Sequence, residues 1–170
     1  MSDTAIEMRR ACAEDIPRIL AITDQARAFQ RASGFVQWQD NYPARANIVA
    51  DIAAGGAYVF CLAGEIIAYA YLCVGDSEYD RLTDTWQCDA PYGVVHRLAV
   101  SSDCQGKGLS ATFFALIEQH FIRSDIHTVR IDTGEENVVM QRIMHRNGYV
   151  CRGVRQFVWG VRLAYEKSLR

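Results

Sequence analysis

The sequence predicts a single α/β domain in which a mixed central β-sheet is flanked by helices on both faces. Strand-like runs of β-branched and apolar residues alternate with stretches whose apolar residues recur at helical spacing. A β-hairpin precedes a strand–turn–helix segment, so antiparallel and crossover connections occur together. The 170 residues suffice for one sizeable core, and no repeat or linker divides them. We therefore expect residues 1–170 to form one domain.

The N-terminal part predicts one short strand and two helices. Residues 6–10 can form the strand, and residues 13–30 carry apolar side chains near helical spacing. Asp15 and Pro17 mark the start of this helix, because both residue types favour the first helical turn. A second, shorter helix is expected around residues 44–54.

The middle of the chain predicts a hairpin, followed by a central strand and helix. Two strand-like runs meet at Ala63 and Gly64, where a tight turn can join them. A polar connection spans residues 75–92. The β-branched segment 94–100 is expected to be a strand, and an amphipathic helix follows it at residues 109–123.

The C-terminal part predicts a strand at residues 128–132 and a helix at residues 137–148, which Gly148 would end as a C-terminal cap. The alternating tail from residue 149 supplies two more strands. The predicted order of elements is therefore βααβββαβαββ.

Composition and charge exclude several classes of protein. The formal net charge is −2, so no basic field is available to gather nucleic acid or an anionic membrane. The polar N-terminus has no secretory signal, and no apolar run is long enough to cross a bilayer, so we expect a cytoplasmic protein. The cysteines are dispersed without metal-ligand spacing, and we expect no bound metal.

Residues 103–111, "DCQGKGLSA", lie between the predicted central strand and its helix. The first N–H groups of a helix lack partners within it, and the helix dipole gives them partial positive charge. Gly106 and Gly108 remove side chains that would keep a ligand away, and Lys107 adds a cation. The turn therefore predicts a site for phosphate or pyrophosphate. The alternative is a plain glycine-rich turn, because short glycine motifs match by accident.

Two common phosphate-binding motifs fit this turn incompletely. A P-loop requires serine or threonine where the chain has Gly108, and glycine where it has Ser101. The Rossmann fingerprint fits Gly106, Gly108 and Ala111, with Asp132 ending the next strand. However, extra residues separate the strand from the first glycine, and too little chain follows to complete a doubly wound sheet. A dinucleotide-binding oxidoreductase is therefore the runner-up.

The residues around the turn also belong to a longer pattern. Leu98-Ala99-Val100 is followed by Gln105-Gly106-Lys107-Gly108-Leu109-Ser110, and downstream come Asp132-Thr133, Asn137, Met140, Ile143 and Gly148-Tyr149. This pattern resembles the GNAT superfamily of N-acetyltransferases, in which [QR]-x-x-G-x-[GA] follows a strand ending in hydrophobic-x-Val. The resemblance covers nearly the whole chain, because the predicted order of elements also matches. Ser110 departs from the pattern, where glycine or alanine is usual.

The resemblance implies that the protein binds acetyl-CoA as a co-substrate and needs no metal. The glycine turn would hold the pyrophosphate, and the strand edge would bond to the pantetheine arm as to an added strand. Asn137 would contact the coenzyme, and its alternative role is a helix N-cap. The implied coenzyme-binding residues are Leu98, Ala99, Val100, Gln105, Gly106, Lys107, Gly108, Leu109, Ser110 and Asn137.

The resemblance also implies direct transfer of the acetyl group to an amine, which requires a base to deprotonate the ammonium. His96 lies four residues before Val100, where members of the superfamily often have the base. It would act directly or through a water molecule, and the alternative is a structural histidine. Its neighbour Arg97 is expected to point to the opposite face of the strand.

The proton donor for the leaving thiolate is a separate question. Many relatives have a tyrosine at the position that Met144 occupies in this chain. His145 and Tyr149 are the candidate substitutes, and solvent is the alternative donor.

Two segments are candidates for binding the acceptor amine. The loop at residues 34–43 carries aromatic and amide groups where the superfamily forms its acceptor wall, namely Phe35, Gln37, Trp38, Gln39 and Tyr42. The connection at residues 75–92 combines acidic residues with Trp86, and these together could hold a cationic amine. The alternative interpretation of this connection is a solvated acidic loop beside a core tryptophan. We also assign Asp132 to acceptor binding.

We therefore predict an acetyl-CoA-dependent N-acetyltransferase that acts on a primary amine of a small molecule or peptide. A non-catalytic acyl-CoA sensor of the same fold is the alternative, because the usual tyrosine is absent at position 144. The apolar final strands could pair in a homodimer.

Overall fold

The structure is a computed structural model that describes residues 5–35, 37–38 and 41–170. Contacts divide the chain into two compact units. The first unit comprises Met1–Leu72 and His96–Leu116, and the second comprises Cys73–Val95 and Ile117–Arg170. Each unit has a hydrophobic core of its own. Within the described ranges, no helix is both long and apolar enough to cross a membrane.

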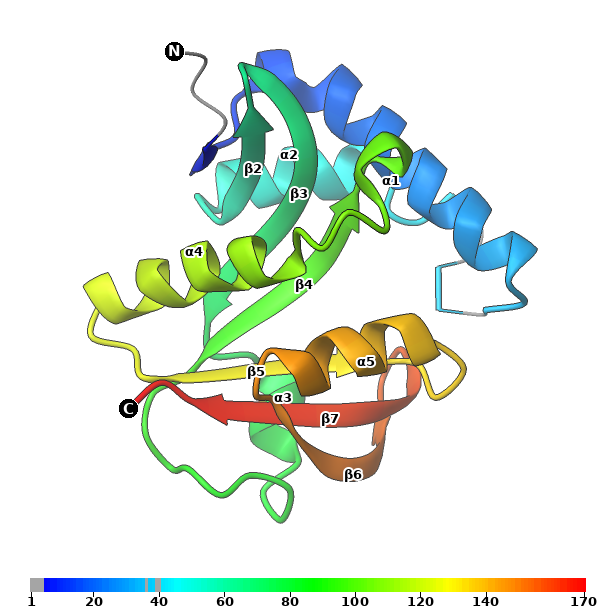
Figure 1. The fold of residues 1–170 in the computed structure, drawn as a ribbon. Coiled ribbons are helices and arrows are strands. Elements are labelled where there is room, and N and C mark those ends of the chain that lie inside the picture. Colours follow the sequence, from blue (N-terminus) through cyan, green and yellow to red (C-terminus); the bar gives the residue numbers. More distant parts are fainter. Residues whose placement is uncertain (1–4, 36, 39–40) are drawn as a thin grey trace. The chain divides into compact units, whose positions relative to one another are not determined.

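The helices and strands follow the predicted order (Figure 1). In chain order they are β1 (Ile6–Arg10), the 3-10 helix η1 (Ala13–Asp15), α1 (Ile16–Ala32), α2 (Arg45–Ala53), β2 (Ala57–Leu62), β3 (Glu65–Val74), α3 (Ser77–Arg81), β4 (Gly93–Val100), the 3-10 helix η2 (Ser102–Cys104), α4 (Ser110–Arg123), β5 (Thr128–Thr133), α5 (Val138–Arg146), β6 (Val150–Phe157) and β7 (Gly160–Ser168). Apart from α3 and the 3-10 helices, this is the order βααβββαβαββ. Three elements, β3, β4 and α4, pass from one unit into the other.

Helix α3 is the element that the sequence did not predict. It lies inside the segment 75–92, which was expected to be an irregular polar connection. The Asp76 side chain caps this helix by accepting a hydrogen bond from the Glu78 N–H at 2.8 Å. Tyr79 is fully buried within it. A helix of five residues is too short to show a 3.6-residue period, and this explains why the pattern was missed.

The first unit is built on strands in the order β1-β2-β3-β4. β1 pairs antiparallel with β2, and β2 pairs antiparallel with β3. Ala63 and Gly64 join β2 to β3, and both have positive φ angles, of 49° and 83°. Positive φ at both central residues is the geometry of a two-residue hairpin turn, so the predicted hairpin is confirmed.

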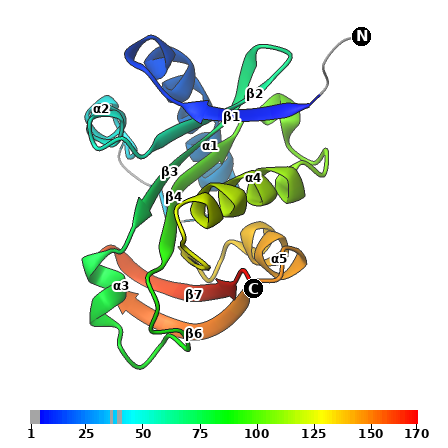
Figure 2. The ribbon, with the colours of Figure 1, turned by 90° about the vertical axis from the view of Figure 1, so that its left-hand side faces the viewer.

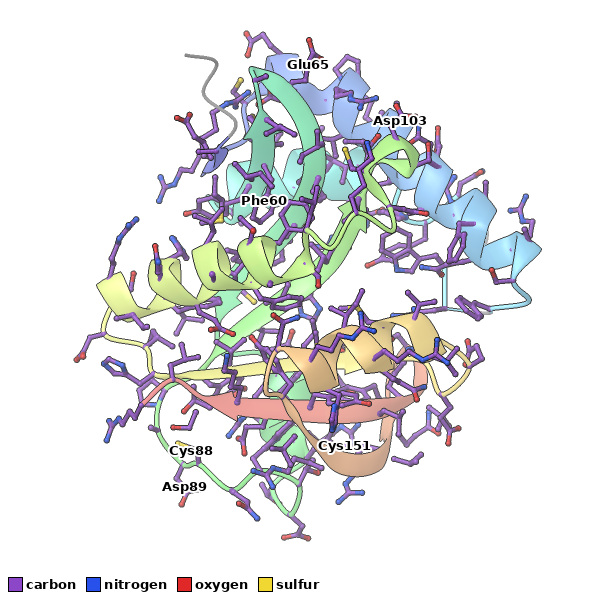
Figure 3. All side chains as sticks on the ribbon, viewed as in Figure 1. Phe60, Glu65, Cys88, Asp89, Asp103 and Cys151 are labelled. Carbon is purple, nitrogen blue, oxygen red and sulfur yellow. The ribbon has the colours of Figure 1, made fainter. Side chains whose placement is uncertain are left out.

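Helices cover both faces of the strands in the first unit. Val59 packs in the core formed with α1 and α2, while the next residue, Phe60, lies against Phe113 of α4 with ring centroids 5.0 Å apart. Consecutive strand residues point to opposite faces, which separates these two contacts. Figure 2 shows α1 and α2 on one side of the strands and the first turns of α4 on the other. Figure 3 labels the Phe60 side chain next to α4.

The second unit holds strands in the order β4-β5-β7-β6. The start of β4 pairs parallel with β5 through Gly93 and Val94, whereas β7 pairs antiparallel with both β5 and β6. The pairing is therefore mixed, as predicted. Helix α5 ends at the glycine that the sequence indicated: Gly148 has φ +82°, and the N–H of Tyr149 donates to the Met144 carbonyl at 3.0 Å.

The core of the second unit is aromatic and contains a buried cation. Tyr79, Tyr92 and Phe157 are buried together, and Trp86 stacks on Tyr79 with ring centroids 5.4 Å apart. The guanidinium of Arg130 lies 3.8 Å from the centroid of the Tyr92 ring.

Tyr92 should make the stability of the protein sensitive to alkaline pH. Burial, together with a 2.5 Å hydrogen bond to Asp80, raises the pKa of Tyr92 to about 12. The folded state therefore holds the phenol proton more tightly than the unfolded state, whose tyrosines titrate near pH 10. The resulting stabilisation is complete below pH 10 and is lost as the pH rises to about 12. We expect Tyr92→Phe to be less stable than the wild type at pH 9 by about 1–2 kcal/mol, with a smaller difference at pH 11. Urea unfolding of both proteins at each pH measures this, and a difference that stays constant would contradict it.

Candidate active site

The turn between β4 and α4 is open and leads directly into the first turn of a helix. Gly106 and Gly108 have φ angles of +73° and +72°, and a Cβ atom on either would meet no atom within 4 Å. The first hydrogen bond of the helix runs from the Phe113 N–H to the Leu109 carbonyl at 3.1 Å. The N–H groups at the start of α4, from Ser110, therefore precede the first intrahelical bond. Lys107 is exposed beside them. Figure 1 shows this turn as the green segment between β4 and α4.

The entry to the turn is fixed to the rest of the first unit. The N–H of Ser101, which is 1% exposed, donates to the Ile67 carbonyl of β3 at 2.8 Å. The Ser101 hydroxyl accepts from Arg18 of α1 at 3.3 Å, and the N–H of Ser102 donates to the Gln25 side chain at 2.9 Å. These bonds hold the peptide before the glycines in one place.

The final residues of β4 pack in part against the core of the first unit. Ala99 is 3% exposed and belongs to the core of the first unit, whereas Leu98 and Val100 are half-buried. The Gln105 side chain donates to the Val100 carbonyl at 3.4 Å. In the strand order, β4 lies between β3 and β5, and its register with β5 covers Gly93 and Val94.

His96 and Arg97 lie earlier on β4 and share one neighbour. The half-buried His96 ring stacks on Tyr71 with centroids 6.3 Å apart and an interplanar angle of 17°. The guanidinium of Arg97 lies 4.9 Å from the centroid of the same Tyr71 ring. The prediction that Arg97 points to the face opposite His96 is therefore wrong. The backbone explains this, because Arg97 has a φ of +53°, which interrupts the alternation of the strand.

The predicted acceptor loop contributes two aromatic residues next to this strand. Trp38 is 7% exposed, so most of its ring belongs to the core, and its ring meets Tyr42 edge to face at 6.5 Å. Tyr42 is 38% exposed, and its hydroxyl accepts a hydrogen bond from Arg97 at 2.9 Å. Gln37 is half-buried.

The two other candidates of the loop, Phe35 and Gln39, are not added to the pair formed by Trp38 and Tyr42. Phe35 packs edge to face on Phe29 of α1, with ring centroids 6.2 Å apart. Gln39 lies outside the described residues. The structure thus brings Trp38, Tyr42, His96 and Arg97 into the first unit, together with the glycine turn.

Tyr149 and His145 lie in the second unit and differ in their surroundings. Tyr149 is 3% exposed, and its hydroxyl donates to Glu118 at 3.2 Å. Lys167 also binds Glu118, at 2.8 Å. Burial, followed by the nearby Glu118 carboxylate, raises the pKa of Tyr149 well above its ordinary value. These surroundings favour a structural role for Tyr149 over proton donation, whereas His145 is exposed on α5.

Asn137 caps helix α5. Its side-chain oxygen accepts a hydrogen bond from the Met140 N–H at 3.1 Å. The N-cap role considered from the sequence is therefore present, and the coenzyme contact stays a prediction.

Asp132 and Trp86 are engaged with side chains of their own unit. The Asp132 carboxylate accepts hydrogen bonds from the Tyr79 hydroxyl and from Trp159 Nε1, the latter at 3.1 Å. Trp86 Nε1 donates to the Tyr79 carbonyl at 2.7 Å, and the Arg130 guanidinium lies 4.4 Å from its ring centroid. The cation over Trp86 is thus an arginine of the chain itself, as expected for a core tryptophan.

A buried acid that binds Arg97 was not predicted from the sequence. Asp51 of α2 is 4% exposed, forms an ion pair with Arg97, and accepts a hydrogen bond from the Tyr69 hydroxyl at 2.6 Å. Burial, followed by this hydrogen bond, raises the pKa of Tyr69 above its ordinary value. A signal was present, because Asp51 is an acid between apolar residues of a predicted helix and Arg97 is a cation within a β-branched strand.

The sequence and the fold of the chain are similar to those of known acetyltransferases. The acetyltransferase (GNAT) family model matches residues 21–149. A crystal structure of a GNAT-family acetyltransferase from Streptococcus agalactiae is 34% identical, with a TM-score of 0.88 over 96% of this chain and 95% of its own. A GNAT-family acetyltransferase from Listeria monocytogenes is 24% identical, with a TM-score of 0.75 over 96% of this chain and 95% of its own. The aminoglycoside acetyltransferase AAC(6')-Ib, solved with coenzyme A and kanamycin, is 19% identical, with a TM-score of 0.73 over 96% of this chain and 95% of its own. No curated protein matches the sequence.

Proposed function

The chain belongs to the acetyltransferase (GNAT) family, and from this premise we propose that it transfers an acetyl group from acetyl-CoA directly to a primary amine of a small molecule or peptide. The observation that carries the proposal is the open turn of Gly106 and Gly108 at the start of α4. Such a turn offers backbone N–H groups and partial positive charge to a pyrophosphate.

The coenzyme would use two stretches of the first unit. The N–H groups from Gly106 to Ser110 would bind the pyrophosphate, with Lys107 as an additional cation. The pantetheine arm carries amides spaced like those of a peptide, and it would bond to the backbone at residues 98–100. The register of β4 supports this, because among the described residues its pairing with β5 covers Gly93 and Val94 and not residues 98–100. AAC(6')-Ib, which shares the fold, has been solved with coenzyme A, and this supports coenzyme binding by the present chain.

The reaction would need one base and no covalent intermediate on the protein. His96 would take a proton from the ammonium, directly or through a water molecule. The neutral nitrogen would then form a bond to the carbonyl carbon of the thioester, and a backbone N–H would stabilise the oxyanion. The nitrogen would release its extra proton to solvent, and the carbon–sulfur bond would break to leave the amide and the thiolate. The thiolate would take a proton from solvent, since the phenol of Tyr149 is bound to Glu118. Proton donation by His145 stays a prediction from the sequence.

The acceptor would be recognised beside β4 in the first unit. Tyr42 supplies an exposed aromatic ring that packs edge to face on the buried Trp38, and Gln37 supplies an amide in the same loop. AAC(6')-Ib has been solved with kanamycin, an aminoglycoside, and this supports a small-molecule amine for the present chain. A cationic amine held by Asp132 and Trp86 has less support, since both side chains already bind groups of the second unit.

The dinucleotide-binding alternative is not retained. The family match covers Gly106, Gly108 and Asp132, which are the residues that this alternative would use. In addition, the carboxylate of Asp132 accepts hydrogen bonds from Tyr79 and Trp159, which gives it a structural role within the second unit.

A thermal melt with ligands tests the proposed function. At about 100 times its dissociation constant, acetyl-CoA should add roughly 2.7 kcal/mol to the free energy of unfolding and raise the melting temperature by several degrees. Coenzyme A should act similarly, and NAD should have no effect. Release of free thiol from acetyl-CoA in the presence of a panel of amines then separates an enzyme from a non-catalytic acyl-CoA sensor. A shift with NAD alone would contradict the proposal.

A further inference from the structure

A single residue in the middle of β4 has a backbone conformation that its side chain disfavours. Arg97 has a φ of +53°, the left-handed region in which a Cβ atom crowds the following carbonyl oxygen. Residues other than glycine keep such a conformation only where their surroundings enforce it, and these positions cluster at functional sites. The bend lies between His96 and Leu98, that is, between the candidate base and the strand proposed to bind pantetheine.

The side chain of Arg97 is held from several sides. Its Nε donates to one carboxylate oxygen of Asp51 at 2.8 Å, and a terminal nitrogen binds the other oxygen. This bidentate pairing fixes the plane of the guanidinium. The other terminal nitrogen donates to Tyr42 at 2.9 Å, and the Tyr71 ring lies against the group at 4.9 Å. Asp51 is itself fixed by the Tyr69 hydroxyl.

The bend determines which way His96 faces. In a regular strand, neighbouring side chains point to opposite faces, so His96 and Arg97 could not both touch one ring. Here both lie against Tyr71. If the backbone at Arg97 relaxed to an ordinary extended conformation, His96 would turn relative to residues 98–100.

We propose that the buried Arg97–Asp51 ion pair holds β4 in its left-handed bend and thereby positions His96 relative to residues 98–100. Arg97 and Asp51 are then positioning residues that touch neither substrate. The kinetic part of this inference rests on the proposed function, since it takes His96 as the base.

Three variants separate the bend from the ion pair. Arg97→Ala removes the anchor and keeps a side chain that disfavours the bend. Arg97→Gly removes the anchor but allows the bend freely. The double variant Arg97→Met with Asp51→Asn removes both charges, so no unpaired charge stays buried, and the new amide can still accept from Tyr69. The double variant should therefore be more stable than Arg97→Ala, but it still lacks the bidentate ion pair that fixes the bend.

The first unit offers a control in a second bidentate pair, whose arginine side chain is more exposed, at 48% against 15% for Arg97. Arg9 of β1 binds both oxygens of Asp15, at 2.7 and 2.9 Å, and Arg9 has no left-handed backbone. Arg9→Ala should lower stability and leave the kinetic constants unchanged. A purely structural role of Arg97 would make its variants behave in the same way.

The readouts are kcat and KM for acetyl-CoA and amine, together with hydrogen exchange of the ligand-free protein. We expect kcat to fall about 100-fold in Arg97→Ala and in the double variant, and less in Arg97→Gly, because small misplacements of a catalytic group have effects of this size. Amides of residues 96–101 should exchange at least about 10-fold faster in Arg97→Ala than in Arg9→Ala. Unchanged exchange in this segment, or a double variant with full kcat, would overturn the proposal. If the wild type transfers no acetyl group, the proposed function fails, and hydrogen exchange still decides whether the ion pair holds the bend.

Discussion

Alanine in place of Gly108 is expected to weaken the binding of acetyl-CoA by about 10- to 100-fold. Gly108 has φ +72°, and its Cβ position faces open space, so the new methyl group clashes with nothing in the protein itself. It would instead project over the turn and keep phosphate oxygens away from the N–H groups of α4. Loss of a hydrogen bond to a charged group is worth about 1.5–3 kcal/mol, and this corresponds to the expected weakening.

A second glycine of the first unit supplies the control. Gly64, in the hairpin between β2 and β3, has φ +83° and also faces open space. Gly64→Ala therefore imposes a similar backbone strain of about 1–3 kcal/mol at a position without an assigned ligand. Calorimetric titration with acetyl-CoA and thermal unfolding of both variants make the comparison. Equal stability losses with a binding defect only in Gly108→Ala are expected, whereas equal affinities in the two variants would show that the turn holds no part of the coenzyme.

The parts of the fold that the sequence predicted are those governed by local chemistry. The hairpin turn and the end of α5 each contain a glycine with positive φ, Gly64 and Gly148, and glycine is the residue that adopts such angles most readily. The central strand follows from its β-branched residues, and the glycine turn follows from two glycines between a strand and a helix. These features need no knowledge of distant parts of the chain.

The parts that could not be predicted depend on partners far away in the sequence. Whether Trp86 meets a ligand or the core depends on Arg130 and on Tyr79, which lies in the unpredicted helix α3. Likewise, the side chain of Arg97 was predicted from strand alternation to point to the face opposite His96. The alternation fails at Arg97, where the backbone is left-handed and the side chain is bound to Asp51. A binary pattern of apolar and polar residues does not specify which buried charges will pair.

Replacing His96 with alanine should lower the rate of acetyl transfer by about 100- to 10,000-fold near neutral pH, which is the usual contribution of a general base. The affinity for acetyl-CoA should stay unchanged, because the coenzyme is assigned to the backbone of residues 98–100 and to the glycine turn. The defect should shrink as the pH rises, since more of the acceptor amine is then neutral without help from a base. The pH dependence of kcat/KM for the amine, measured for both proteins, tests this expectation.

His127 provides the matched control for this substitution. It is a half-buried histidine of the second unit that binds Asp125 at 3.0 Å, and it has no assigned role in the reaction. His127→Ala should therefore retain the wild-type pH profile. If His96→Ala also keeps that profile, His96 is not the base, and a water molecule would have to take the proton without it. If His96→Ala instead loses affinity for acetyl-CoA together with rate, its stacking on Tyr71 serves the structure of β4 and not proton transfer.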